Sequence, residues 1–240
     1  MERIGTMNKA LTIVLPCYNP ISKWEENLLY NCKAIIKNLP DVSVEIILVN
    51  DGSQHGINST NIDFLKSEIL SFKYIQYNKN KGKRFAVREG FKHASHENII
   101  FTDIDFPYKL DGLIAMSHKL FNAEGDIIVG VRSKDYYKNV PFHRRFISKT
   151  LIKLNKILLN LPVGETQAGL KGFSLKGKEA MLLSTINGYL FDIEVLKIGK
   201  KNSCKIIGSQ VALRDDVIFS SMGIKLLVKE FKNFIKILFT

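Results

Sequence analysis

Cysteine is scarce in this chain of 240 residues, which has three, Cys17, Cys32 and Cys204, widely spaced and without a CxxC pair. An odd number at such spacings excludes a disulfide framework and the paired cysteines of a structural zinc site. Cys17 ends an apolar run, where a small buried thiol is the usual role of this residue. We therefore expect a reducing compartment and no structural disulfides.

Long apolar runs are also absent. No stretch approaches the roughly 18 apolar residues that a bilayer-spanning helix requires. Residues 1–10 are polar, and the apolar run at 11–16 is too short for the core of a secretory signal. The sequence therefore predicts a cytoplasmic protein, soluble or peripherally attached to the cytosolic face of a membrane, with residues 1–10 as an extension before the domain.

The sequence shows neither a histidine metal site nor a nucleophilic triad. Its five histidines are scattered without metal-ligand spacing, and no Ser-His-Asp or Cys-His pattern indicates a hydrolase. Acidic residues are in deficit, with 23 Asp and Glu against 35 Lys and Arg, which gives a net charge of +12. This excess predicts an anionic partner, and composition leaves open whether that is nucleic acid, an anionic membrane or a phosphate-bearing substrate.

Two alternative classes lack their usual signals. A nucleic-acid-binding protein usually shows a basic region with interleaved aromatics, a zinc pattern or a helix-turn-helix, and none is recognisable, so we expect no nucleic-acid partner. A nucleotidyltransferase needs a Gly-rich loop after its first strand, where this chain has Pro16-Cys-Tyr-Asn-Pro20.

Short apolar, β-branched runs alternate with helical patterns through the first half of the chain. The expected strands are residues 11–16, 45–51, 72–77, 98–103 and 126–130, and the expected helices are residues 24–39, 61–70, 83–94 and 110–121. This alternation predicts an α/β fold with a mostly parallel sheet flanked by helices. The binding crevice of such a sheet lies beyond the carboxyl ends of its strands, where the polar segments of this chain fall.

The second half is less regular. An amphipathic helix with a basic stripe is expected at 142–159, then a Gly-rich stretch at 164–172, strand-like residues 173–175, a helix near 191–200 and a strand near 204–213. A catalytic domain over 11–221 would then be followed by a basic amphipathic helix at 222–240. That helix fits an interfacial membrane helix and a helix packed on the domain equally well.

Asp103 and Asp105 follow an apolar strand and lie two residues apart. In an extended segment this spacing places both carboxylates on the same side. Two carboxylates that close repel each other unless a cation lies between them, and Mg²⁺ typically takes one or two carboxylates together with substrate phosphates. The pair is therefore a candidate site for a divalent metal that neutralises charge on a departing diphosphate.

Two further segments contain turn-forming residues together with side chains that are able to bind a ligand. Residues 50–53, Asn-Asp-Gly-Ser, are typical of a turn, and the Asp51 carboxylate is also able to accept from a nucleobase N–H. Residues 80–90 bring a glycine and basic side chains to a helix start, which suits an anion or simply a solvated helix end.

Taken together, these segments resemble glycosyltransferase family 2, in the branch of the dolichyl-phosphate mannosyl- and glucosyltransferases. The resemblance covers roughly residues 11–215 and depends on the order of seven short motifs. They are Leu15-Pro-Cys-Tyr-Asn19, Val49-Asn-Asp-Gly-Ser53, residues 80–90, Phe101-Thr-Asp-Ile-Asp105, Gly130-Val-Arg132, Thr166-Gln-Ala-Gly-Leu-Lys-Gly172 and Phe191-Asp-Ile-Glu194.

The resemblance implies a GT-A fold and an inverting, metal-dependent transfer of a hexose from a UDP- or GDP-sugar to a polyprenyl phosphate, with Mg²⁺ or Mn²⁺ held by Asp103 and Asp105. The implied donor-binding residues are Pro16, Tyr18, Asn19, Asp51, Lys83, Arg88, Asp103 and Lys171. The implied catalytic residues are Asp105, Arg132, Gln167 and Asp192. Thr166 and Glu194 match further positions of the same motifs.

The acceptor decides which side chains are needed. A lipid phosphate is already an anion, so it requires positive charge rather than a strong base, and Arg132, Arg144 and Arg145 fit that role. A glycan hydroxyl would instead require a base, for which Asp192 and Glu194 are the candidates. A lipid acceptor implies a membrane surface and permits a membrane-protein partner. Two departures from the family pattern are Pro20, where Glu is frequent, and Pro107, where mannosyl relatives often carry Gln as a metal contact.

Overall fold

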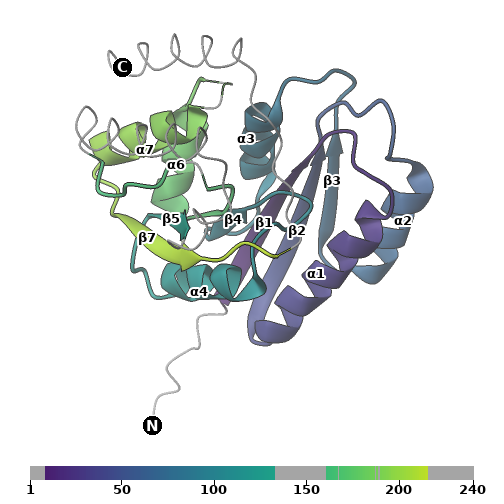
Figure 1. The fold of residues 1–240 in the computed structure, drawn as a ribbon, viewed down its shortest axis with the longest axis horizontal. Coiled ribbons are helices and arrows are strands. Elements are labelled where there is room, and N and C mark those ends of the chain that lie inside the picture. Colours follow the sequence, from purple (N-terminus) through teal and green to yellow (C-terminus); the bar gives the residue numbers. More distant parts are fainter. Residues whose placement is uncertain (1–8, 133–160, 167, 187, 189, 216–240) are drawn as a thin grey trace.

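A seven-stranded sheet forms the centre of the computed structural model, which describes residues 9–132, 161–166, 168–186, 188 and 190–215 (Figure 1). The strands lie in the order β3-β2-β1-β4-β6-β5-β7. Their bounds are β1 Lys9–Cys17, β2 Val42–Asn50, β3 Phe72–Gln76, β4 Ile99–Phe101, β5 Ile127–Arg132, β6 Lys171–Phe173 and β7 Ile206–Val211. All neighbours are parallel except β6, which is antiparallel to both β4 and β5.

Helices cover both faces of this sheet (Figure 1). One face packs against α1 Trp24–Asn38, α2 Ser59–Glu68 and α4 Leu110–Phe121, and the other against α3 Lys83–His93, α6 Leu175–Leu183 and α7 Phe191–Lys201. Each face of the sheet has its own buried cluster. Along β1, Ile13 and Leu15 pack on the side of α1, α2 and α4, whereas Val14 packs on the side of α3, α6 and α7. Burial on both faces explains why the strands read as continuous apolar runs.

This architecture confirms the predicted α/β fold with a mostly parallel sheet flanked by helices, and its strands and helices lie close to their expected positions. The strand-like assignment of residues 173–175 was wrong. β6 ends at Phe173, and Ser174 is the N-cap of α6, accepting a hydrogen bond from the Gly177 amide at 3.3 Å. Periodicity did not reveal α6 because Leu175, Leu182 and Leu183 are all exposed, which blurs its apolar stripe.

Strand β6 is locked into the sheet by an aromatic cluster. The Phe173 ring lies 5.1 Å from that of Phe91 on α3 and 6.1 Å from that of Phe101 on β4, centroid to centroid. Each such pair adds about 0.5–1.5 kcal/mol beyond the burial of its area. The cluster therefore fixes the position of Lys171 at the start of the same strand.

Several expectations fall on residues outside the described ranges. These are the basic helices at 142–159 and 222–240, together with Arg144, Arg145 and Gln167. Among the described helices, none has both the length and the apolarity to cross a bilayer. Cys17, Cys32 and Cys204 are buried free thiols, and burial raises the pKa of Cys17 and Cys32 to about 12.

A buried carboxylate, Glu45, links β1, β3 and the segment before β4. Its oxygens accept from the Thr12 hydroxyl at 2.7 Å and the Ser95 amide at 2.9 Å, and form an ion pair with Lys73 at 2.7 Å. Burial by itself would raise the pKa of Glu45, but the bonds from Lys73, Ser95 and Thr12 outweigh it and lower the pKa to about 2. The native state therefore holds this group ionised far below the pH at which an unfolded glutamate becomes protonated.

We expect Glu45→Gln to lower the free energy of unfolding near neutral pH by about 2–3 kcal/mol. The contribution is fully present above pH 4.5, the ordinary value, and is lost as pH falls toward 2. Denaturant unfolding across that range should show a steep acid loss in the wild type and a flatter one in the variant. Glu68→Gln removes an exposed ion pair with Lys33 and should cost under about 1 kcal/mol. Equal losses for both variants would contradict this assignment.

Candidate functional site

The carboxyl ends of β1, β2 and β4 meet at one edge of the sheet. Cys17 pairs with Asn50, and Val14 pairs with Phe101, so the segments that follow these strands are neighbours. A cavity of about 380 Å³ opens at this edge. It is lined by Pro16, Cys17, Tyr18, Asp51, Asn80, Gly82 and Lys83. The structure thus brings four of the proposed donor-binding residues, Pro16, Tyr18, Asp51 and Lys83, to one place.

Asp51 lines this cavity and is held in place by the backbone of residues 79–81. Its side chain is buried, and its Oδ1 accepts from the Lys81 amide at 2.8 Å. Gly52 follows with φ of +69°, and a Cβ there would lie 2.6 Å from the Asn80 amide nitrogen. Only glycine allows the turn to pack this closely against residues 79–80. The turn predicted from Asn-Asp-Gly-Ser is therefore present and also delivers Asp51 into the cavity.

Asp103 connects the cavity to the end of β4. Its carboxylate forms an ion pair with Lys83, the first residue of α3, and both side chains are about one-third exposed, at 33% and 38%. Asp105 lies on the surface, yet partial burial of its carboxylate and the charge of Asp103 raise its pKa. The two carboxylates therefore repel each other, as their spacing predicted.

Asp103 and Asp105 do not lie on the extended segment that was predicted. Residues 103–106 form a tight turn in which the Phe106 amide donates to the Asp103 carbonyl at 3.0 Å, with Phe106 at φ of +47°. Within the described ranges, no group of three His, Cys, Asp or Glu side chains is arranged to hold a metal. The two carboxylates supply hard oxygen ligands, and a bound diphosphate would have to supply others.

Gly169 brings the Gly-rich stretch against this turn. A Cβ on Gly169 would lie 2.8 Å from Asp103 Oδ2, so a larger residue there would displace this carboxylate. The Gly169 amide also donates to the Tyr108 hydroxyl at 3.0 Å. Burial raises the pKa of Tyr108, which keeps the hydroxyl neutral. Sequence reasoning singled out neither residue, although the glycine in Thr166-Gln-Ala-Gly was an available signal.

Arg132 ends β5 and is already paired. Its Nε and a terminal nitrogen donate to the two Glu165 oxygens at 2.9 and 2.8 Å, and both side chains are largely buried, at 13% and 7% exposed. This fork geometry fixes the orientation of the guanidinium. Glu165 was not among the predicted residues, because no local pattern indicates that a carboxylate lies opposite Arg132.

Lys171 and Asp192 form a second buried pair. The Lys171 ammonium lies 2.9 Å from Asp192 Oδ1 and donates to the Ala168 carbonyl at 2.6 Å. Burial lowers the pKa of Lys171, whereas Asp192 acts in the opposite direction. The pair joins β6 to the first turn of α7, so these two predicted residues are partners of each other.

Three other predicted residues hold backbone in place. Glu194 accepts from the Thr185 amide and hydroxyl and from the Ile186 amide at 2.8–3.0 Å, and Arg88 donates to the Ile186 carbonyl at 3.3 Å. Asn19 Oδ1 accepts from the Gln54 amide at 2.8 Å, which ties the first loop to the second. Arg88 and Asn19 are not among the residues that line the 380 Å³ cavity.

Comparisons with known proteins agree with this arrangement. Residues 12–177 match the family described as "Glycosyl transferase family 2". A dolichyl-phosphate beta-glucosyltransferase of Drosophila melanogaster is 25% identical over 218 residues, 85% of this chain and 66% of that protein. A dolichol-phosphate mannosyltransferase of Pyrococcus furiosus is 28% identical over 198 residues, 79% of this chain and 53% of that protein.

A solved structure with the same fold is a mannosyltransferase from Pyrobaculum calidifontis in complex with GDP-Man and Mn²⁺. Its TM-score is 0.64 at 17% identity, covering 96% of this chain and 65% of that one. This chain spans about half to two-thirds of the length of the curated relatives that it matches.

Proposed function

This chain belongs to glycosyl transferase family 2, and we propose that it moves a hexose, with inversion, from a UDP- or GDP-sugar to a polyprenyl phosphate. The observation that carries the proposal is the cavity at the sheet edge, which is lined by the Asp51 carboxylate and by Lys83, the partner of Asp103. A nucleoside diphosphate has the same polarity, with a base that offers N–H groups and a diphosphate that needs positive charge.

A divalent cation fits the acidic end of this site. Asp103 and Asp105 offer oxygen ligands at a point where their mutual repulsion favours a cation, and Mg²⁺ or Mn²⁺ would have diphosphate oxygens as further ligands. The cation would act as a Lewis acid toward the leaving diphosphate. Mn²⁺ in the Pyrobaculum calidifontis mannosyltransferase supports this choice.

Different side chains of the protein would bind the base, the diphosphate and the acceptor. Asp51 would accept from the base, and Lys83 would attract the diphosphate while releasing Asp103 from their ion pair. Arg132, oriented by Glu165, would align the acceptor phosphate for in-line attack. Pro16 and Tyr18, which line the same cavity, would form walls of the nucleoside pocket.

Two carboxylates, Asp192 and Glu194, are the candidate bases for a glycan hydroxyl acceptor. Because both are already engaged by other groups of the protein, an anionic acceptor is favoured. Asp192 is in an ion pair with Lys171, and Glu194 accepts three hydrogen bonds from residues 185–186. A carboxylate engaged in this way is a poor base, and a phosphate acceptor needs none. The dolichyl-phosphate glucosyltransferase and the dolichol-phosphate mannosyltransferase among its relatives support this acceptor class.

Nucleotide binding tests the proposal directly. We expect UDP or GDP, together with Mn²⁺, to raise the melting temperature, because Asp51 in the cavity offers an acceptor to a base N–H and Asp103 and Asp105 offer oxygen ligands to the metal. Mn²⁺ alone and each nucleotide with EDTA are the controls. If neither nucleotide stabilises the protein in a metal-dependent way, the proposed donor site is wrong.

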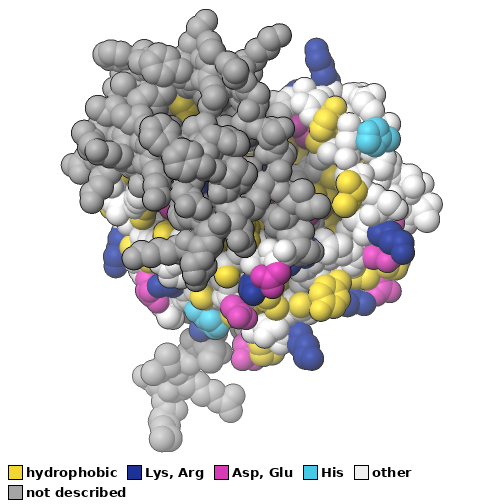
Figure 2. Space-filling model, in the orientation of Figure 1, with side chains coloured by type: hydrophobic (Ala, Val, Ile, Leu, Met, Phe, Trp, Pro, Cys, Tyr) yellow, Lys and Arg dark blue, Asp and Glu magenta, His cyan; other side chains and the backbone are white. Residues whose placement is uncertain are grey.

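We further propose a peripheral, cytosolic membrane contact through the segments at 133–160 and 216–240. They carry eleven lysines and arginines and three acidic residues, and so account for most of the net charge of +12. In contrast, the described surface in Figure 2 shows basic and acidic side chains interspersed. The protein should co-sediment with phosphatidylserine vesicles at low salt and be released at high salt. Equal retention on neutral vesicles would contradict an electrostatic contact.

A further inference from the structure

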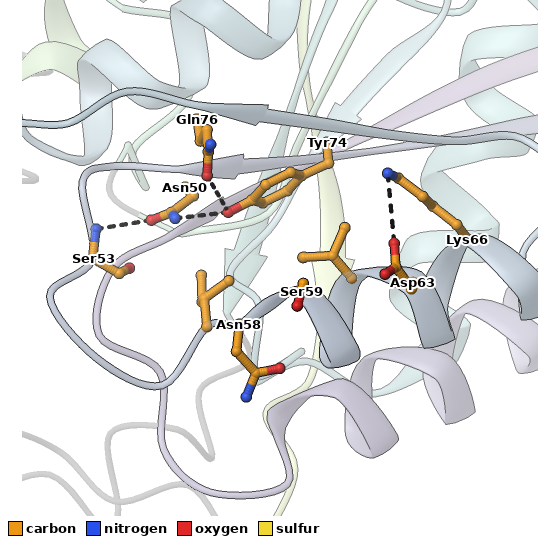
Figure 3. A pocket seen from close by; sticks show the side chains of 10 residues that line it. Asn50, Ser53, Asn58, Ser59, Asp63, Lys66, Tyr74 and Gln76 are labelled. Carbon is orange, nitrogen blue, oxygen red and sulfur yellow. Dashed lines mark hydrogen bonds and ion pairs between the residues drawn. The ribbon is translucent and has the colours of Figure 1, made fainter.

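A second cavity, of about 440 Å³, lies between α2 and β3 (Figure 3). It shares no lining residue with the donor cavity, and the two approach each other at the end of β2, where Asn50 lines one and Asp51 the other. This volume is typical of sites for small ligands.

One wall of this cavity is a fixed chain of polar groups (Figure 3). The Ser53 amide donates to Asn50 Oδ1 at 2.9 Å, Asn50 Nδ2 donates to the Tyr74 hydroxyl at 2.8 Å, and that hydroxyl donates to Gln76 Oε1 at 3.1 Å. The chain fixes which atoms remain available to a ligand. Within the described part of the protein, the Gln76 amide nitrogen and the Ser59 hydroxyl have no hydrogen-bond partner.

The opposite end carries one charge of each sign. Asp63 and Lys66 lie on α2 as an exposed pair 3.9 Å apart, and Ile57 and Ile62 form the apolar part of the lining. An anion would meet Asp63, and a cation would meet Lys66, so neither is favoured. An apolar ligand would leave the Gln76 amide nitrogen and the Ser59 hydroxyl without partners, which costs free energy.

We propose that this cavity binds a neutral sugar, one pyranose unit held free or as part of a glycan. Each sugar hydroxyl both donates and accepts; among the lining residues, the Gln76 amide nitrogen donates, and the Ser59 hydroxyl donates and accepts. The ring of Tyr74 and the side chain of Ile57 supply the apolar surface that the C–H face of a pyranose covers. The site is separate from the donor cavity and does not depend on the proposed transfer reaction.

Titration of the full chain with methyl glucoside and with maltotriose, followed by amide chemical shifts, tests this site. We expect shifts at Ser53, Ser59 and Gln76 with a dissociation constant in the millimolar range. Tighter binding of maltotriose would indicate a glycan, and equal binding would indicate a single sugar unit. Gln76→Ala should weaken binding about tenfold, because it removes the free amide donor. Gln210→Ala, an exposed glutamine on the opposite edge strand β7, is the matched control and should bind as the wild type does.

Three results would overturn the proposal. The first is the absence of shifts at these amides with both sugars. The second is equal affinity in Gln76→Ala and wild type, confirmed with Tyr74→Phe in case one variant is misfolded. The third is loss of the sugar-induced shifts when UDP is added, because competition would place the sugar in the donor cavity and not between α2 and β3.

Discussion

Replacing Asp103 with asparagine should lower the rate of hexose transfer about a thousandfold, the effect of losing several kcal/mol of charge stabilisation. Asparagine keeps the shape of the side chain but removes the charge that balances Lys83 and opposes Asp105. The measurement is transfer from UDP-glucose and GDP-mannose to a polyprenyl phosphate under single-turnover conditions. Because Asp103 and Lys83 are partly exposed, the free energy of unfolding should change by less than about 1 kcal/mol.

A matched control separates this effect from a general change of charge. Asp111 is exposed in the first turn of α4, and Asp111→Asn should leave the transfer rate within about twofold of the wild type. Wild-type transfer by Asp103→Asn would remove this carboxylate from the site. A loss of Mn²⁺-dependent nucleotide binding together with transfer would instead place it on the metal-diphosphate side.

The largest stability effect is expected at the buried pair of Lys171 and Asp192. Asp192→Ala leaves the Lys171 ammonium buried without its counter-charge and should cost about 3–5 kcal/mol. Burial already lowers the pKa of Lys171, and without Asp192 it should fall further. The unfolded state then binds more protons than the native state between that lowered pKa and the ordinary 10.5. The stability of this variant should therefore recover as pH rises through that window.

A double variant tests whether the pair is needed for the fold or for chemistry. Lys171→Met with Asp192→Leu replaces the ion pair by apolar side chains and should regain most of the lost stability. If the double variant is stable and inactive, the pair contributes to the reaction beyond packing. If it is stable and fully active, Asp192 is excluded as a base. Denaturant unfolding and transfer assays on all four proteins give both answers, and additive stability losses would contradict direct coupling of the two charges.

Much of the site could be predicted because parallel strands end at a common edge. Asp51 and Asp103 each follow an apolar strand, and the registers of β1 with β2 and β4 bring their segments together. Lys83 was predictable in the same way, as the first residue of the helix after Gly82. These inferences needed only chain order and the alternation of strand and helix.

Residues whose role depends on a distant partner could not be assigned in advance. Arg88 is predicted to lie near the nucleotide, and the structure adds a contact of its guanidinium with the Ile186 carbonyl, 98 positions along the chain. Glu165 had no visible role until β5 brought Arg132 opposite it. Such contacts cannot be predicted from short stretches of sequence, because they form only when separate elements pack together.

The sequence by itself determined the α/β class, the order of elements and the polar segments at the strand ends, because these follow from apolar periodicity and turn chemistry within short windows. The tertiary structure alone decided that β6 enters antiparallel between β4 and β5, which places Lys171 against Asp192 and Gly169 against Asp103. That insertion is a property of how distant segments share one sheet. It brings Gly169 against Asp103, one of the two carboxylates that follow β4 at the edge of the sheet where the cavity opens.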